Sequence, residues 1–267
     1  MKKDFPSLNK NKILSYLDKN LIDLDADLLI SDSTGSTNDD AKNFLVDQSN
    51  ILSFHVTEQQ IAGKGRNGKK WVSPKGRNIY LSTAWITELN YTQLDGLSLA
   101  TGIVVAKSLN KYANNQIKLK WPNDLLVNNK KISGVLIETI DLDSKLGVVI
   151  GIGVNIHMNE AEGKDIDQSW ATLDGISNKI HDRNEILGDL ISGIGVMTED
   201  FSRKGFKAFK ADFEKLDLLI GKKCKVEIKG TDKIVEASGV NDKGELVVKD
   251  NLEYLTLRYG EVSIREL

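Results

Sequence analysis

Hydrophobic residues recur along the chain with two periods, one typical of helices and the other of strands. The helical spacing predicts helices at about residues 10–19, from Ser36 onward, at 94–112 and at 182–213. Apolar runs predict strands at residues 51–57 and 78–86, and further strands that end near Lys120 and Ile150. Helices and strands mix without strict βαβ alternation, so we predict an α+β fold with a mixed β-sheet and flanking helices.

The pattern changes near residue 219. Short alternating runs at 224–229, 234–238 and 245–249 are separated by turns at Lys229-Gly230 and at residues 241–244. Short strands joined by such turns predict a small β-barrel. We therefore divide the chain into a larger domain at residues 1–218 and a small one at 219–267.

A glycine-rich loop between the strands carries the densest positive charge. Residues 63–74 read Gly-Lys-Gly-Arg-Asn-Gly-Lys-Lys-Trp-Val-Ser-Pro. Glycines allow backbone conformations with positive φ, so successive N–H groups can point inward while lysines and an arginine supply charge. The loop suits a phosphate or carboxylate, but its spacing is not that of a P-loop. The structural alternative is a solvated basic turn.

A second segment suited to an anion is Lys118-Leu-Lys-Trp-Pro-Asn-Asp-Leu-Leu126. Alternation places Lys118 and Lys120 on one face of a short strand that Pro122 ends. A lysine at a strand end, beside a tryptophan, can meet developing negative charge in a reaction. The alternative is an exposed lysine that protects an edge strand.

Two further segments follow in order, residues 131–138 (Lys-Ile-Ser-Gly-Val-Leu-Ile-Glu) and 151–156 (Gly-Ile-Gly-Val-Asn-Ile). The second is not a dinucleotide-binding turn, because its third glycine is missing and no helical pattern follows. Together with residues 63–74 and 120–124, these segments resemble, in order and spacing, the successive motifs of biotin protein ligases. The similarity extends from about residue 8 to the end of the chain.

The resemblance implies a catalytic domain like that of class II aminoacyl-tRNA synthetases and an SH3-like C-terminal barrel. It implies that biotin and ATP form biotinyl-5′-AMP and pyrophosphate. The biotinyl group then passes to a lysine of the biotin carboxyl carrier domain of acetyl-CoA carboxylase. Magnesium is expected with the ATP, bound mostly through water and phosphate oxygens.

By position in the motifs, Arg66 and Lys120 match the catalytic residues, which neutralise the repulsion between the biotin carboxylate and the α-phosphate. The residues that match biotin-binding positions are Ser36, Thr37, Asn38, Gln60, Lys64, Gly65, Arg66 and Lys120. Those that match ATP-binding positions are Gly63, Arg66, Asn123, Asn155, Trp170 and Arg265, and Asp124 is a candidate metal ligand.

Several of these residues have structural alternatives. Ser36 or Thr37 can be a helix N-cap, with an aspartate three positions later in a capping box. Trp170 can be a core or rim aromatic residue, and Arg265 an ordinary surface arginine. The loop carries Lys64 and Asn67 where the family commonly has arginines, so we expect weaker retention of the adenylate.

Composition agrees with a cytoplasmic enzyme. The 267 residues carry a net charge of −2 with a pI near 6.0, which argues against a general nucleic-acid binder. Cys224 is the single cysteine, the three histidines lack metal-site spacing, and no apolar run is long enough to span a membrane. The sequence starts too late for a winged helix-turn-helix, so we expect no DNA binding.

Two alternatives to the biotin ligase remain. A lipoate protein ligase shares the type of chemistry, but it is not expected to match the Lys-Trp-Pro-Asn-Asp and Gly-Lys-Gly-Arg segments this closely. A non-catalytic biotin-binding sensor is the other. The sequence leaves open whether the protein is a monomer or a homodimer.

Overall fold

The computed structural model describes residues 5–18, 27–47, 52–228, 231–258 and 262–266, and within these ranges the strands form two sheets. The larger sheet has seven strands, in the spatial order β1 (Asp27–Ser31), β2 (Leu52–Thr57), β3 (Ile79–Thr87), β7 (Lys145–Val154), β6 (Lys130–Leu142), β5 (Asp124–Val127) and β4 (Lys118–Lys120). β1 and β2 are parallel, and the other described neighbours are antiparallel. The sheet is therefore mixed, as predicted.

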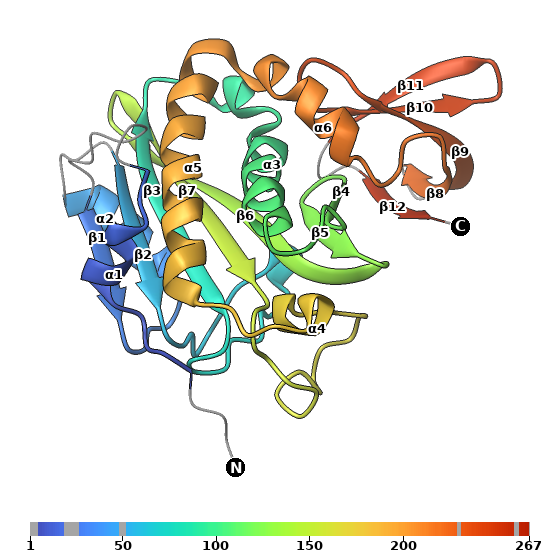
Figure 1. Ribbon diagram of the computed structural model, residues 1–267. Coiled ribbons are helices and arrows are strands. Elements are labelled where there is room, and N and C mark those ends of the chain that lie inside the picture. The colour runs from blue at the N-terminus through green and yellow to red at the C-terminus, as the bar shows by residue number, and fades with distance from the viewer. Residues whose placement is uncertain (1–4, 19–26, 48–51, 229–230, 259–261, 267) are drawn as a thin grey trace.

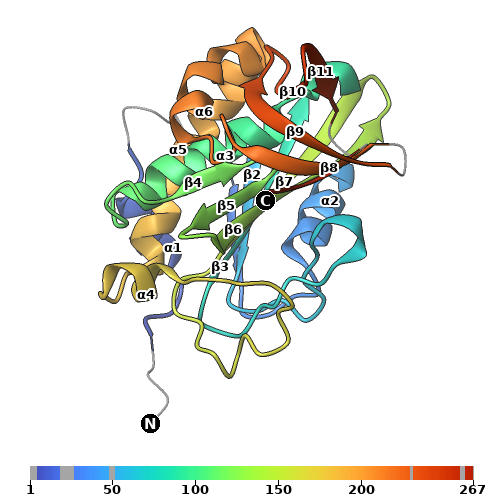
Figure 2. The ribbon, with the colours of Figure 1, turned by 90° about the vertical axis from the view of Figure 1, so that its right-hand side faces the viewer.

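Helices pack on both faces of the large sheet (Figure 1). α1 (Lys10–Ser15), α3 (Leu97–Asn110) and α5 (Arg183–Lys204) form one layer, and Figure 2 shows α2 (Thr37–Asp47) across the sheet from α1 and α5. Side chains of a strand alternate between faces, so Leu81 of β3 enters the main core while Ala84 packs under α2. β3 is buried on both faces, which explains its almost continuous apolar run.

The register of the three central strands determines which residues face α2. Ser82 on β3 is opposite Gly151 on β7, and Gly151 is opposite Leu136 on β6. One step along, Gly153 of β7 lies between Tyr80 and Gly134. This face of the sheet thus has three glycines in two neighbouring rows, and at these three positions the sheet has no side chain.

The second sheet is antiparallel, in the order β11 (Glu253–Leu257), β10 (Leu246–Asp250), β9 (Thr231–Val240), β8 (Lys223–Ile228) and β12 (Val262–Glu266). Its alternating residues, such as Val226, Val235 and Val248, are buried. Trp121 connects the two sheets, because its Nε1 donates a hydrogen bond to Gly244 O at 3.0 Å. The small C-terminal β structure is confirmed, and the boundary at residue 219 stays a prediction.

The remaining elements are short. They are α4 (Leu173–Ser177), α6 (Lys210–Leu216) and the 3₁₀ turns η1 (Arg66–Gly68), η2 (Tyr91–Leu94) and η3 (Phe206–Ala208).

The prediction of one helix over residues 182–213 is wrong. α5 ends at Lys204, and Gly205 adopts a φ of 62° before η3 and α6 begin. A positive φ cannot continue a right-handed helix, and glycine adopts it at low cost. The helix expected at residues 10–19 is also shorter: it ends at Ser15, and Lys19 lies outside the described residues.

Candidate active site

A cavity of about 810 Å³ opens on the α2 face of the large sheet. Its volume is within the usual range for small-molecule sites. Its lining brings together nearly all the residues that the sequence singled out: Ser36, Thr37, Asn38, Gln60, Lys64, Gly65, Arg66, Lys120, Asn123, Asp124, Asn155 and Trp170. Motifs separated by more than a hundred residues in the sequence therefore line one cavity.

The floor of the cavity is made by Gly151 and Gly153 on β7. A Cβ on Gly151 would lie 2.3 Å from Asn38 Oδ1, and a Cβ on Gly153 would lie 2.4 Å from Cε2 of Trp71. No side chain fits at such distances without displacing its neighbour. The Gly-x-Gly motif thus serves close packing: it lets Asn38 and Trp71 lie against the sheet.

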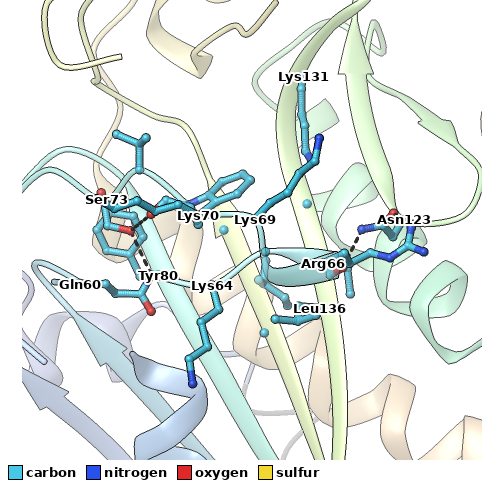
Figure 3. A pocket seen from close by; sticks show the side chains of 18 of the residues that line it. Gln60, Lys64, Arg66, Lys69, Lys70, Ser73, Tyr80, Asn123, Lys131 and Leu136 are labelled. Carbon is cyan, nitrogen blue, oxygen red and sulfur yellow. Dashed lines mark hydrogen bonds between the residues drawn. The ribbon is translucent and has the colours of Figure 1, made fainter. Parts of the chain in front are cut away.

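The N-terminus of α2 meets Gln60 at one end of the cavity. Thr37 donates from its backbone N and its Oγ1 to Gln60 Oε1, at 3.0 and 3.1 Å. Gln60 Nε2 donates to Ser73 Oγ at 3.0 Å, so both ends of its amide have partners (Figure 3). α2 begins at Thr37, which puts Ser36 at the N-cap position. Ser36 and Thr37 are both buried.

Asn38 is fixed by a second group of hydrogen bonds. Its Nδ2 donates to Glu138 Oε2 at 2.7 Å, and Ser82 Oγ lies 2.6 Å from its Oδ1. Lys42 forms an ion pair with the other oxygen of Glu138. This end of the cavity therefore has neutral donors and acceptors whose orientations are set by their neighbours.

The glycine-rich loop folds back on itself as a small hairpin. Gly65 N donates to Lys69 O at 2.7 Å, and Trp71 N donates to Gly63 O at 2.9 Å. Of the three glycines only Gly68 has a positive φ, of 72°. The N–H groups of Gly65 and Trp71 bond within the hairpin, so these two do not contribute to the inward-pointing set of N–H groups that the glycines were expected to allow. Gly63 lacks room for a side chain instead, because a Cβ would lie 2.6 Å from Trp71 O.

The cations around the cavity differ in their partners. Arg66 Nη1 donates to Asn123 Oδ1 at 2.8 Å, and Figure 3 shows this pair across the pocket from Gln60 and Ser73. Lys64 pairs with Asp39 at 2.6 Å, and Figure 3 shows its side chain directed away from the other labelled lysines. Lys120 lines the cavity, and within the described part of the chain it has no ion-pair partner.

Lys131 was absent from the predicted set of site residues, although it begins one of the motifs. Its Nζ lies 2.7 Å from Asp124 Oδ1 and 5.5 Å from the ring centroid of Trp71. The backbone of Lys131 also pairs with Trp170 and holds that residue beside the cavity. Its place in the same motif as Gly134 could have indicated that Lys131 lies at the cavity, because both residues line it.

Trp170 and Asn155 lie at the other end of the cavity. The Trp170 ring packs on Gly163, where a Cβ would lie 2.3 Å from Cζ2. Asn155 is buried, and its backbone bonds to Ile132 O and Leu173 N. A half-buried indole beside a fixed amide is an arrangement suited to a planar heterocycle.

Two predicted residues are not among the described residues that line the cavity. Gly63 lies at the base of the hairpin, against Trp71 and Ser73. Arg265 is on β12, where its backbone is paired with Lys225, and its side chain lies outside what the structure describes. The proposed contact of Arg265 with a nucleotide stays a prediction.

Comparison with known proteins gives this cavity a context. Residues 30–155 match the model of the biotin/lipoate A/B protein ligase family. The bifunctional ligase/repressor BirA of Escherichia coli is 33% identical over 97% of this chain and 78% of its own length. A solved structure of a biotin protein ligase from Aquifex aeolicus, in complex with biotin and ATP, superposes with a TM-score of 0.76 at 30% identity. It covers 90% of this chain and 99% of its own.

The chain belongs to the biotin protein ligase family. The biotin–[acetyl-CoA-carboxylase] ligase of Mycobacterium tuberculosis is a further relative, 28% identical over 86% of this chain and 85% of its own. Membership confirms the expected fold, a mixed sheet with flanking helices. In this ligase the described helices include none with the length and hydrophobicity that a membrane span requires.

Proposed function

We propose that this ligase activates biotin with ATP and transfers the biotinyl group to a lysine of a biotin carrier domain. The observation that carries the proposal is the set of residues that line the cavity on the α2 face of the large sheet. A neutral polar end at α2, the two cations Lys120 and Arg66, and an aromatic end at Trp170 line the same space. These three parts suit, respectively, a ureido ring, two reacting anions and an adenine.

The polar end is proposed to bind the ureido head of biotin. A cyclic urea has one carbonyl and two N–H groups. Burying any of these groups without a hydrogen-bond partner costs about 1–3 kcal/mol of binding free energy. Ser36, Thr37 and Gln60 are neutral and are buried or half-buried, and hydrogen bonds orient the side chains of Thr37 and Gln60. Neutral groups match a neutral ring, and their fixed orientation lowers the entropy lost on binding.

Arg66 and Lys120 are proposed to bring the two anions together. The biotin carboxylate has to attack the α-phosphate of ATP, and the repulsion between them falls when fixed cations share their charge. Arg66 can bond two oxygens at once, whereas Lys120 supplies a compact charge. Attack forms the acyl-phosphate bond of the adenylate as pyrophosphate leaves.

Asp124 offers the carboxylate that a magnesium ion with ATP would need. Such ions use one or two carboxylates with phosphate oxygens and water, and Asp124 lines the cavity beside Lys131. No group of three or more His, Cys, Asp or Glu residues suited to a metal occurs in the described part of the chain. The ion would neutralise phosphate charge, and Lys131 already balances the charge of Asp124.

The second step needs an acceptor amine at the cavity. Its nitrogen attacks the acyl carbon of the adenylate, AMP leaves, and the amine proton passes to solvent. The biotin carboxyl carrier domain of acetyl-CoA carboxylase is the proposed acceptor, by analogy with the relatives. The composition of the sequence supports a cytoplasmic location for this reaction.

Transfer of labelled biotin to a purified carrier domain with Mg-ATP tests this function. Replacing Lys120 or Arg66 by alanine should slow transfer by about 10²–10³-fold, as for other donors to developing negative charge. Lys118→Ala is the matched control, because Lys118 lies on the same short strand but bonds Lys215 O at the surface.

Three results would contradict the proposal. The first is no transfer and no pyrophosphate release by the wild-type chain, which would favour a sensor. The second is a rise in melting temperature with lipoate and ATP but not with biotin and ATP, which would favour a lipoate ligase. The third is an equal effect of Lys118→Ala and Lys120→Ala.

A further inference from the structure

The N-terminal segment packs against the loop that carries Trp170. The Phe5 ring is stacked on the His157 ring, with 3.8 Å between centroids and 3° between planes. The guanidinium carbon of Arg77 lies 5.1 Å from the centroid of the same Phe5 ring. Phe5 is therefore in contact with two residues from different parts of the fold, one of which begins the loop between β7 and α4.

His157 is fixed at the base of this loop. Its side chain is 1% exposed, and its Nδ1 lies 2.6 Å from Asp174 Oδ2. Its backbone N donates to Arg77 O at 3.0 Å, and its Nε2 is buried without a partner among the described residues. The Phe5 ring covers one flat face of the His157 imidazole and so helps to screen it from water.

Arg77 extends the contact toward the cavity. Its Nε donates to Glu162 Oε1 at 2.7 Å, and only 12% of its side chain is exposed. Glu162 Oε2 accepts from Asn159 N at 3.0 Å, which closes a turn in the loop. The next residue, Gly163, is the one against which the Trp170 ring packs. An unbroken series of contacts thus runs from Phe5 through Arg77 and Glu162 to Trp170.

The segment that presents Phe5 is itself held firmly. Arg183, with 1% of its side chain exposed, donates to Pro6 O at 3.0 Å and to Glu58 Oε2 at 2.8 Å. Leu8 N donates to Glu58 Oε1 at 2.6 Å. Pro6, the residue after Phe5, accepts a hydrogen bond from the buried Arg183. The backbone that carries the Phe5 ring is therefore fixed beside the loop.

We propose that Phe5 is a positioning residue for the nucleotide end of the cavity. It acts through the stack on His157 and the Arg77–Glu162 pair, which set the position of the loop and hence of Trp170. It does not touch the end of the cavity at α2. Loss of the ring should therefore weaken use of ATP and leave recognition of biotin unchanged. The inference rests on the proposed function, in which Trp170 faces the adenine.

The test measures initial rates of pyrophosphate release by the full chain with saturating carrier domain as acceptor, with ATP varied at saturating biotin and biotin varied at saturating ATP. Phe5→Ala should raise KM for ATP by about 2- to 10-fold, the range for a lost aromatic stack. KM for biotin and kcat should stay at the wild-type values. Phe5→Tyr keeps the ring and should restore KM for ATP.

Two further variants separate positioning from general destabilisation. Leu8→Ala removes a core-facing side chain from the same segment, so it should lower the melting temperature without changing KM for ATP. Glu162→Gln leaves Phe5 in place but weakens the pair with Arg77, so it should raise KM for ATP selectively even if Phe5→Ala fails to fold.

The inference is overturned if Phe5→Ala or Glu162→Gln leaves KM for ATP unchanged, or if KM for biotin rises equally. It is also overturned if Leu8→Ala raises KM for ATP as much as Phe5→Ala, because the effect would then follow stability. In each case wild-type pyrophosphate release leaves the proposed function intact. Absence of pyrophosphate release by the wild type would refute both.

Discussion

Replacing Gly151 by alanine tests how the floor of the cavity determines biotin binding. The new Cβ would lie 2.3 Å from Asn38 Oδ1 and 3.0 Å from its Cγ. A carbon rarely approaches an oxygen closer than about 3.3 Å, so Asn38 has to move by roughly 1 Å. That movement breaks its short contacts with Ser82 and Glu138, because a shift of this size takes both beyond hydrogen-bond distance.

The expected loss follows from those contacts. One buried polar group left without its partner costs about 1–3 kcal/mol, which corresponds to a 5- to 150-fold weaker Kd. Isothermal titration of biotin into the Gly151→Ala variant, without ATP, measures this value directly. Gly35→Ala is the matched control, since a Cβ there would have no heavy atom within 4 Å.

A double-mutant cycle with Asn38→Ala shows whether Asn38 transmits the effect. If the clash with Asn38 is the cause, the Gly151→Ala change should add nothing once the Asn38 side chain has been removed. Two results would refute the reasoning: biotin binding to Gly151→Ala within error of the wild type, or additive losses in the double mutant. Urea denaturation of each variant separates lost binding from lost stability.

The other predictions concern stability and the loop. Glu58→Gln leaves a buried arginine without its charge partner and should lower the free energy of unfolding by about 3–5 kcal/mol in urea denaturation, whereas Asp32→Asn at an exposed pair should cost at most about 1. Burial lowers the pKa of His55, so the unfolded chain takes up the proton first as pH falls below about 6.5. The free energy of unfolding should therefore fall as the pH is lowered through that range, and it should fall less steeply in His55→Gln; equal slopes would contradict this. Lys64→Arg with Asn67→Arg should slow dissociation of the adenylate in a filter-binding assay, and an unchanged rate would show that loop charge does not retain it.

The sequence predicted the site better than it predicted the reason for each residue. Lys120 and Arg66 were selected because a lysine at a strand end and an arginine in a glycine-rich loop suit anions, and both line the cavity. Those choices depend on residue type and on neighbouring residues, both of which can be read from the sequence. The placement of Asn38 against Gly151 depends on the pairing of β3, β7 and β6, which no local pattern contains.

The errors have equally local causes. Helical periodicity continues through Gly205, so the hydrophobic pattern alone predicts one long helix. The signal for its end was present, since Arg203 and Lys204 precede a glycine, the usual order at a helix C-terminus. Lys131 begins one of the motifs, but only the tertiary fold puts Asp124 and Trp71 beside it.

The contact between Arg66 and Asn123 explains how two motifs far apart in the sequence act as one site. Asn123 Oδ1 accepts from Arg66 at 2.8 Å, while its Nδ2 donates to Val135 O at 2.9 Å. The amide thus joins the glycine-rich loop to the turn that follows Lys120, and it is anchored to β6. Arg66 is hydrogen-bonded to Asn123, and Lys120 precedes the turn that contains Asn123. A shift of this turn would therefore move both of the proposed catalytic cations. The separation between their charges, on which stabilisation of the meeting anions depends, is therefore set by the sheet as well as by the loop.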